Sequence, residues 1–109
     1  MDKVIQYQEA NKAVNILFFY LADMDNMPVE MMNEIDMADD YFEAVGNIPP
    51  YDFSQMEYKR VLRHLDAVKR HLERMLGAVS NDIWDKDELG GAFQLCQSAI
   101  KETLEAQAA

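Results

Sequence analysis

The feature that most constrains this chain is a seven-residue apolar run at residues 16–22, which continues a helical pattern begun near residue 7. Apolar side chains recur there at alternating steps of three and four residues, the spacing of one face of an α-helix. They are Tyr7, Ala10, Val14, Leu17, Leu21 and Met24. A helix over about residues 3–24 is therefore predicted, with one stripe that other segments must bury.

Four apolar side chains of this run lie outside the stripe: Ile16, Phe18, Phe19 and Tyr20. The second half of the helix is thus apolar around most of its circumference, as in a helix that is covered on several sides. We therefore expect this helix to be central, with the other helices packed on it. The alternative is that a second molecule covers these four side chains, which would make the protein a self-assembling helical subunit that forms a homodimer.

The second predicted helix covers about residues 28–45, and Pro28 suits its first turn because a proline there sacrifices no hydrogen bond. Its core stripe is predicted to be Met31, Ile35, Ala38, Phe42 and Val45. The third helix, about residues 54–79, opens with a capping box formed by Ser54 and Glu57. Its stripe is predicted to be Tyr58, Val61, Leu65, Val68, Leu72, Met75 and Val79, although Gly77 offers an earlier end.

The fourth predicted helix covers about residues 87–107, with Asp85 as a candidate N-cap. Gly90 and Gly91 lie near its start, where each costs about 1 kcal/mol relative to alanine, so we expect them to mark a close helix crossing. Its inward residues are predicted to be Leu89, Phe93, Cys96, Ile100 and Leu104. The sequence therefore predicts an all-α, small single-domain bundle of four main helices over residues 1–109.

The cellular setting is predicted from what the chain lacks. Cys96 is the only cysteine, and residues 1–3 are not followed by the apolar segment that marks a signal peptide. The apolar run of seven residues is short against the roughly 20 that span a bilayer. We expect a cytoplasmic protein with no membrane partner.

Charge is distributed unevenly along the chain. Twenty acidic and ten basic residues give a net charge of −10. Residues 23–53 hold nine acids and no base, whereas residues 54–80 hold six bases and three acids. A chain with this much negative charge repels nucleic acid and attracts basic partners. We therefore expect no direct binding to nucleic acid.

An acidic band on the second helix is the candidate binding site. It consists of Asp36, Asp39, Asp40 and Glu43, whose carboxylates would lie about 5 to 6 Å apart along one side of the helix. Three interpretations stay open: a surface for a basic partner, with Met37 as an adaptable apolar contact; a carboxylate metal site; and a solvated outer face that the cations of the third helix partly neutralise. The Glu-x-x-His pairs of di-iron bundles are missing, which disfavours the metal site.

No residue pattern indicates catalysis. His64 and His71 are seven residues apart, whereas a zinc-binding pair on one helix is normally four apart. We expect both at the edge of the core, near acids of the second helix. Cys96 has no histidine or basic residue beside it in the sequence, so it is predicted to pack in the core. We predict a protein that is not an enzyme and has no cofactor or metal.

The predicted function is that of a non-enzymatic, acidic protein-binding module that occupies a basic site on a partner, such as a nucleic-acid-binding protein. Short acidic helical chains without catalytic groups include many inhibitors carried by phages and mobile elements, among them anti-CRISPR and anti-restriction proteins. The chain is similar to these in size and charge, and no motif identifies a family.

Overall fold

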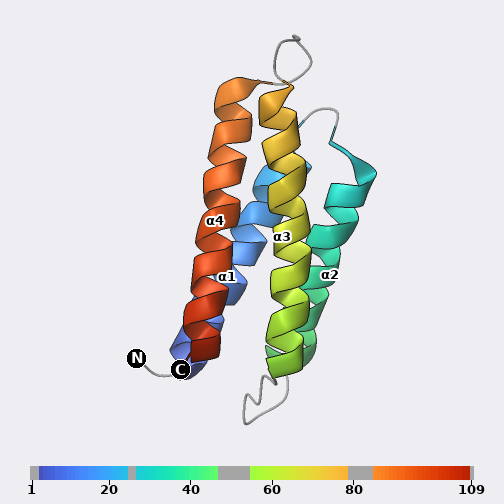
Figure 1. Cartoon of the computed structure of the whole chain (residues 1–109). Helices are drawn as coiled ribbons and strands as arrows, with labels where there is room; N and C mark the ends of the chain where they lie inside the picture. The colour runs from blue at the N-terminus through green and yellow to red at the C-terminus, as the bar shows by residue number, and fades with distance from the viewer. Residues whose placement is uncertain (1–2, 25–26, 47–54, 79–84, 109) are drawn as a thin grey trace.

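The computed structural model describes residues 3–24, 27–46, 55–78 and 85–108, and it confirms four helices. They are α1 (Lys3–Ala22), α2 (Val29–Gly46), α3 (Gln55–Gly77) and α4 (Lys86–Ala108), shown in Figure 1. No strand occurs within these ranges. A search of the same ranges finds no helix with the length and apolarity that a bilayer crossing requires.

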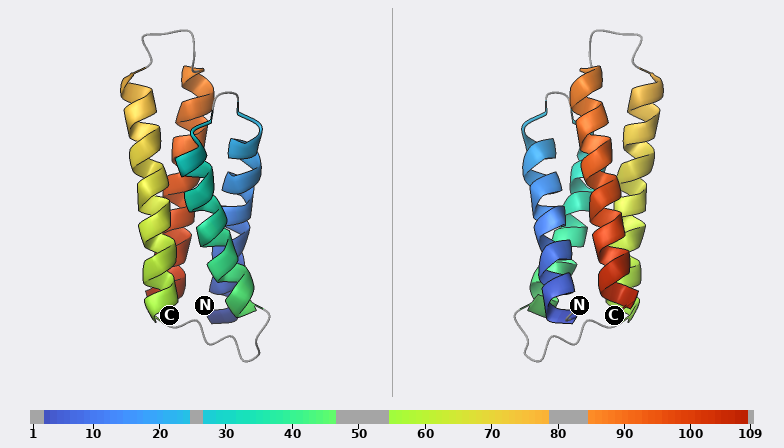
Figure 2. Two further views of the ribbon diagram at one scale, coloured as in Figure 1. Left: turned by 90° about the vertical axis from the view of Figure 1, so that its right-hand side faces the viewer. Right: turned by 90° about the vertical axis from the view of Figure 1, so that its left-hand side faces the viewer.

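The helices form an antiparallel bundle, in which α1 and α3 run in one direction and α2 and α4 in the other (Figures 1 and 2). α1 packs on α4 and α2, and α3 packs on the same two helices. Within the described ranges α1 and α3 do not approach each other, so the helices occupy the corners of a square. The expectation that α1 is central is therefore wrong. A corner helix has two neighbours, which leaves Ile16 and Phe19 of α1 exposed.

The core consists of the apolar stripes predicted for the first three helices. Every member of these stripes whose side chain the structure describes is buried, from Ala10 in α1 to Met75 in α3. The side chains of Tyr7, Val45 and Val79 lie outside the described part of the chain. Burial of each large aliphatic or aromatic side chain contributes roughly 1.5 to 3 kcal/mol, so these stripes stabilise the bundle.

The inward face of α4 differs from the predicted stripe. It consists of Leu89, Ala92, Cys96, Ala99, Thr103 and Ala106. Phe93 and Ile100 are only partly buried, and Leu104 is 49% exposed. The prediction is confirmed for Leu89 and Cys96 and wrong for the other three positions, because the rest of the inward face consists of alanines and a threonine. Thr103 is tolerated there since its hydroxyl donates to the Ala99 carbonyl oxygen at 2.8 Å.

Two helix ends follow the local signals in the sequence. The Asp85 carboxylate accepts hydrogen bonds from the amides of Asp87 and Glu88 at 2.9 and 3.0 Å, which confirms it as the N-cap of α4. α3 takes the earlier of its two possible ends, at Gly77. Ser54 of the predicted capping box lies outside the described residues.

Gly91 lies where α1 crosses α4. The Tyr20 hydroxyl donates to the Glu88 carbonyl oxygen at 3.2 Å, and a Cβ built on Gly91 would lie 2.7 Å from that hydroxyl oxygen. A Cβ on Gly90 would meet no atom within 4 Å. Gly91 therefore accommodates the tip of the Tyr20 side chain, whereas Gly90 has open space beside it, and the close crossing expected at these glycines stays a prediction.

We predict that Gly90→Ala raises the free energy of unfolding by up to about 1 kcal/mol, because alanine favours the helix and fills open space. The free energy of unfolding of Gly91→Ala should be roughly 1 kcal/mol lower than that of Gly90→Ala, because the new methyl group displaces the Tyr20 hydroxyl and breaks its hydrogen bond. Urea unfolding monitored by circular dichroism measures both. In a Tyr20→Phe background the two alanine variants should become equal; a persistent gap would contradict the assigned contact.

Candidate functional site

The acidic band of α2 divides into exposed and covered members. Asp36 and Asp40 are exposed, and we refer to these two residues as the acidic flank. Asp39 is half-buried, and Met37 is 42% exposed. The side chain of Glu43 lies outside the described part of the chain.

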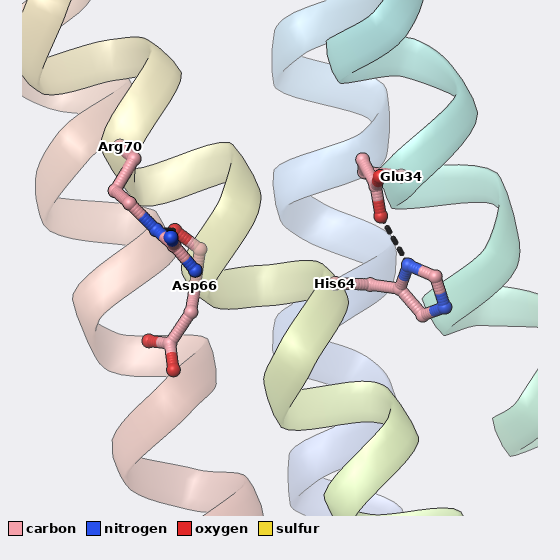
Figure 3. A network of polar contacts seen from close by, with 4 residues as sticks. All are labelled: Glu34, His64, Asp66 and Arg70. Carbon is pink, nitrogen blue, oxygen red and sulfur yellow. Dashed lines mark hydrogen bonds and ion pairs between the residues drawn. The ribbon is translucent and has the colours of Figure 1, made fainter.

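α2 contacts α3 through a different side, which carries Glu34 and Tyr41. The Glu34 carboxylate accepts from Nδ1 of His64 (Figure 3). The Tyr41 ring stacks on the His64 ring at a centroid distance of 5.9 Å. Asp36 follows Glu34 by two residues, which is about 200° around the helix axis at roughly 100° per residue. The acidic flank therefore points away from α3.

Three of the described cations of α3 contact groups other than the acidic flank. The Arg60 guanidinium lies over the Tyr41 ring, 5.6 Å from its centroid, which is a cation–π contact. Arg70 donates from Nε to the backbone oxygen of Asp66 at 3.3 Å, on the side of α3 opposite His64 (Figure 3). Arg74 donates to Nδ1 of His71 at 2.8 Å.

The carboxylates of the acidic flank are therefore not neutralised by a cation of the described residues. Over the described ranges, no lysine or arginine forms an ion pair with Asp36 or Asp40. Neutralisation by the third helix is thus not found at these two carboxylates, and their exposure fits both a solvated face and a surface for a basic partner. Their i,i+4 spacing places two unneutralised negative charges about one turn apart on an exposed surface.

His64 is at the edge of the core beside an acid of α2, as predicted. Its Nδ1 pairs with Glu34, and its Nε2 is enclosed without a hydrogen-bond partner among the described residues. His71 is half-buried, and its Nδ1 accepts a hydrogen bond from Arg74 of its own helix, so its expected proximity to an acid of α2 stays a prediction.

Cys96 is buried, as predicted, and its thiol donates to the Leu65 carbonyl oxygen at 3.4 Å. The pKa of the thiol is raised to about 12, chiefly by burial and also by the negative charge of Asp66, while Lys69 opposes this shift. The thiol is therefore neutral near pH 7 and is a poor nucleophile. Within the described ranges, no group of three or more His, Cys, Asp or Glu side chains could hold a metal ion.

The four apolar side chains assigned to self-association separate into two pairs. Phe18 and Tyr20 pack against the core. Ile16 is 45% exposed and Phe19 is 67% exposed. The Phe18 ring meets the Phe19 ring edge to face at 5.7 Å, so a partly buried residue packs against the exposed one.

A shallow groove between α1 and α4 was not predicted from the sequence. It has a volume of about 180 Å³, and residues of both helices line it, among them Lys12, Ile16, Leu95 and Glu102. Residues 79 or more positions apart meet there, and single-helix periodicity carries no signal for such a pairing. The pairing of Arg60 with Tyr41 was missed for the same reason, since each belongs to a different helix.

Comparison of the chain with protein-family models, with curated proteins and with solved structures finds no match. The function is therefore argued from the residues and their geometry.

The raised pKa of Cys96 makes a prediction about alkaline stability. Below pH 9.0 the thiol is neutral in both the folded and the unfolded chain, and between pH 9.0 and about 12 the unfolded chain ionises first. The wild-type free energy of unfolding should therefore fall more steeply across this window than that of Cys96→Ala. Urea unfolding across the same pH range measures both slopes, and parallel slopes would show that the thiol ionises alike in both states.

Proposed function

We propose that the protein is a non-enzymatic binding module whose acidic flank, Asp36 and Asp40, docks into a basic site on a partner protein. The observation that supports this most directly is that both carboxylates are exposed and form no ion pair within the described ranges. α2 as a whole holds six acids and no base. Met37 lies between the two carboxylates in the sequence and offers a flexible apolar contact beside them.

Electrostatics favours such a complex over the free protein. Like charges at i,i+4 destabilise a helix by a few tenths of a kcal/mol, and a cationic partner would relieve this repulsion. The net charge of −10 adds a long-range attraction that accelerates encounter with a basic surface at low salt.

The chemistry of the flank indicates the class of partner. Proteins that bind nucleic acid present grooves lined with lysine and arginine, which recognise closely spaced phosphate charges. A rigid helix with exposed carboxylates one turn apart offers a similar pattern of negative charge. We infer that the protein is an inhibitor that occupies such a groove, of the kind that phages and mobile elements carry.

We predict that the double variant Asp36→Lys, Asp40→Lys folds normally and loses roughly tenfold or more of its partner capture at low salt, because it reverses charge where the partner docks. The matched control is Glu73→Lys, Glu105→Lys, which makes the same change in net charge at two other exposed acids. Affinity capture from a lysate of the source organism, with quantitative mass spectrometry, measures the proteins retained by each form.

A partner retained by the wild type and the control but lost by the flank variant would support the proposal. Equal loss in both variants would mean that only net charge matters, and equal retention in all three forms would remove the acidic flank from the binding site. Circular dichroism of each variant confirms that the helices are intact.

A further inference from the structure

We propose that the groove between α1 and α4 is a two-fold interface for a second copy of this chain. The groove lies on a flank that does not contain Asp36 or Asp40, so this inference is independent of the proposed function. Three observations carry it: exposed apolar side chains, charges of both signs in one groove, and a footprint of suitable size.

The apolar observation concerns α1. Ile16 lines the groove and is 45% exposed, and Phe19, three residues on, is 67% exposed. Side chains three residues apart are neighbours on a helix surface, so together they form one apolar patch. Burial of an exposed phenylalanine and an isoleucine against another molecule is favourable by roughly 25 cal/mol for each Å² removed from water.

The charges that line the groove favour a second copy of this chain as its occupant. Lys12 lines the groove together with Glu9 and Glu102, so both signs occur in one small surface. A two-fold axis places a surface against its own copy, and charges of both signs are what such a self-complementary interface needs. Lys12 of one copy can then meet Glu9 or Glu102 of the other.

The other helices are less suited to contact their own copies. The charged residues of α2 are all acidic, so two α2 surfaces would repel each other. α3 exposes charges of both signs, among them Arg63, Asp66 and Glu73, but none of its large apolar side chains that the structure describes is exposed.

The size of the flank fits a dimer. Two neighbouring helices, each of about 20 residues, present a surface roughly 30 Å long and 20 Å wide. Standard interfaces bury about 800 Å² from each partner. That is roughly an eighth of the 6509 Å² of accessible surface of this chain.

Sedimentation velocity on the full chain over a range of concentrations tests the interface. The wild type should dimerise at micromolar concentration, and Ile16→Gln with Phe19→Gln should weaken the dimer roughly 100-fold, since each side chain is used twice. The matched control is Val29→Gln with Leu104→Gln, which removes two apolar side chains that are 69% and 49% exposed outside the groove. It should change the dissociation constant by less than about threefold.

A wild type that stays monomeric at the highest concentration would overturn the proposal, as would equal weakening in both variants.

Variants that reverse the charges of the groove test, independently of folding, whether the two grooves face each other. Lys12→Glu alone, and Glu9→Lys with Glu102→Lys alone, should each dimerise several-fold more weakly, whereas a mixture of the two should form the heterodimer. A mixture no tighter than either variant would exclude the groove-to-groove contact.

Salt separates this interface from the proposed partner site. Screening weakens attraction between the acidic flank and a basic partner, whereas it relieves repulsion between two copies that each carry a charge of −10. The dimer should therefore tighten with added salt, and Asp36→Lys with Asp40→Lys should leave it intact. A dimer that weakens with added salt would contradict this expectation, and one lost in that variant would place the acidic flank of one copy against a basic surface of the other.

Discussion

Burial of one apolar stripe per helix fixes how each helix is rotated about its own axis, and the surface properties of the bundle follow from that rotation. In α2 the stripe from Met31 to Phe42 faces inward. Glu34 and Tyr41 are then turned to α3, and Asp36 and Asp40 are turned to solvent. A rotation that paired the acidic flank with the cations of α3 would expose part of the core. Because buried apolar side chains contribute far more than exposed ion pairs, the core decides the orientation.

The distance between helices is set by the small side chains of α4. Ala92, Ala99 and Ala106 on its inward face allow close packing, and Gly91 gives the Tyr20 ring room where α1 crosses. α1 has two neighbours in this arrangement and cannot bury all of its apolar residues. The exposed Ile16 and the groove beside it are therefore consequences of the same packing that closes the core.

The acidic flank and the α1/α4 groove depend on different physical interactions. The acidic flank depends on charge that the fold leaves unneutralised, and its two carboxylates repel each other within the free protein. The α1/α4 groove depends on apolar area and on locally balanced charges. Because they lie on different helices, one copy of the chain can present the acidic flank while the groove is occupied. A dimer would then carry two acidic flanks and could bind a partner with two basic sites more tightly than a monomer does.

The sequence by itself determined the number of helices, their approximate bounds, and the inward residues of α1, α2 and α3, because three-four spacing and helix caps act within a single segment. It also located the acidic residues and the buried Cys96. Tertiary structure alone decided that α1 is a corner helix, that α4 buries alanines in place of Ile100 and Leu104, and which charges of α2 and α3 meet. The physical reason is that periodicity reports which face of a helix is apolar, whereas the identity and distance of its neighbours depend on how four such faces fill one core.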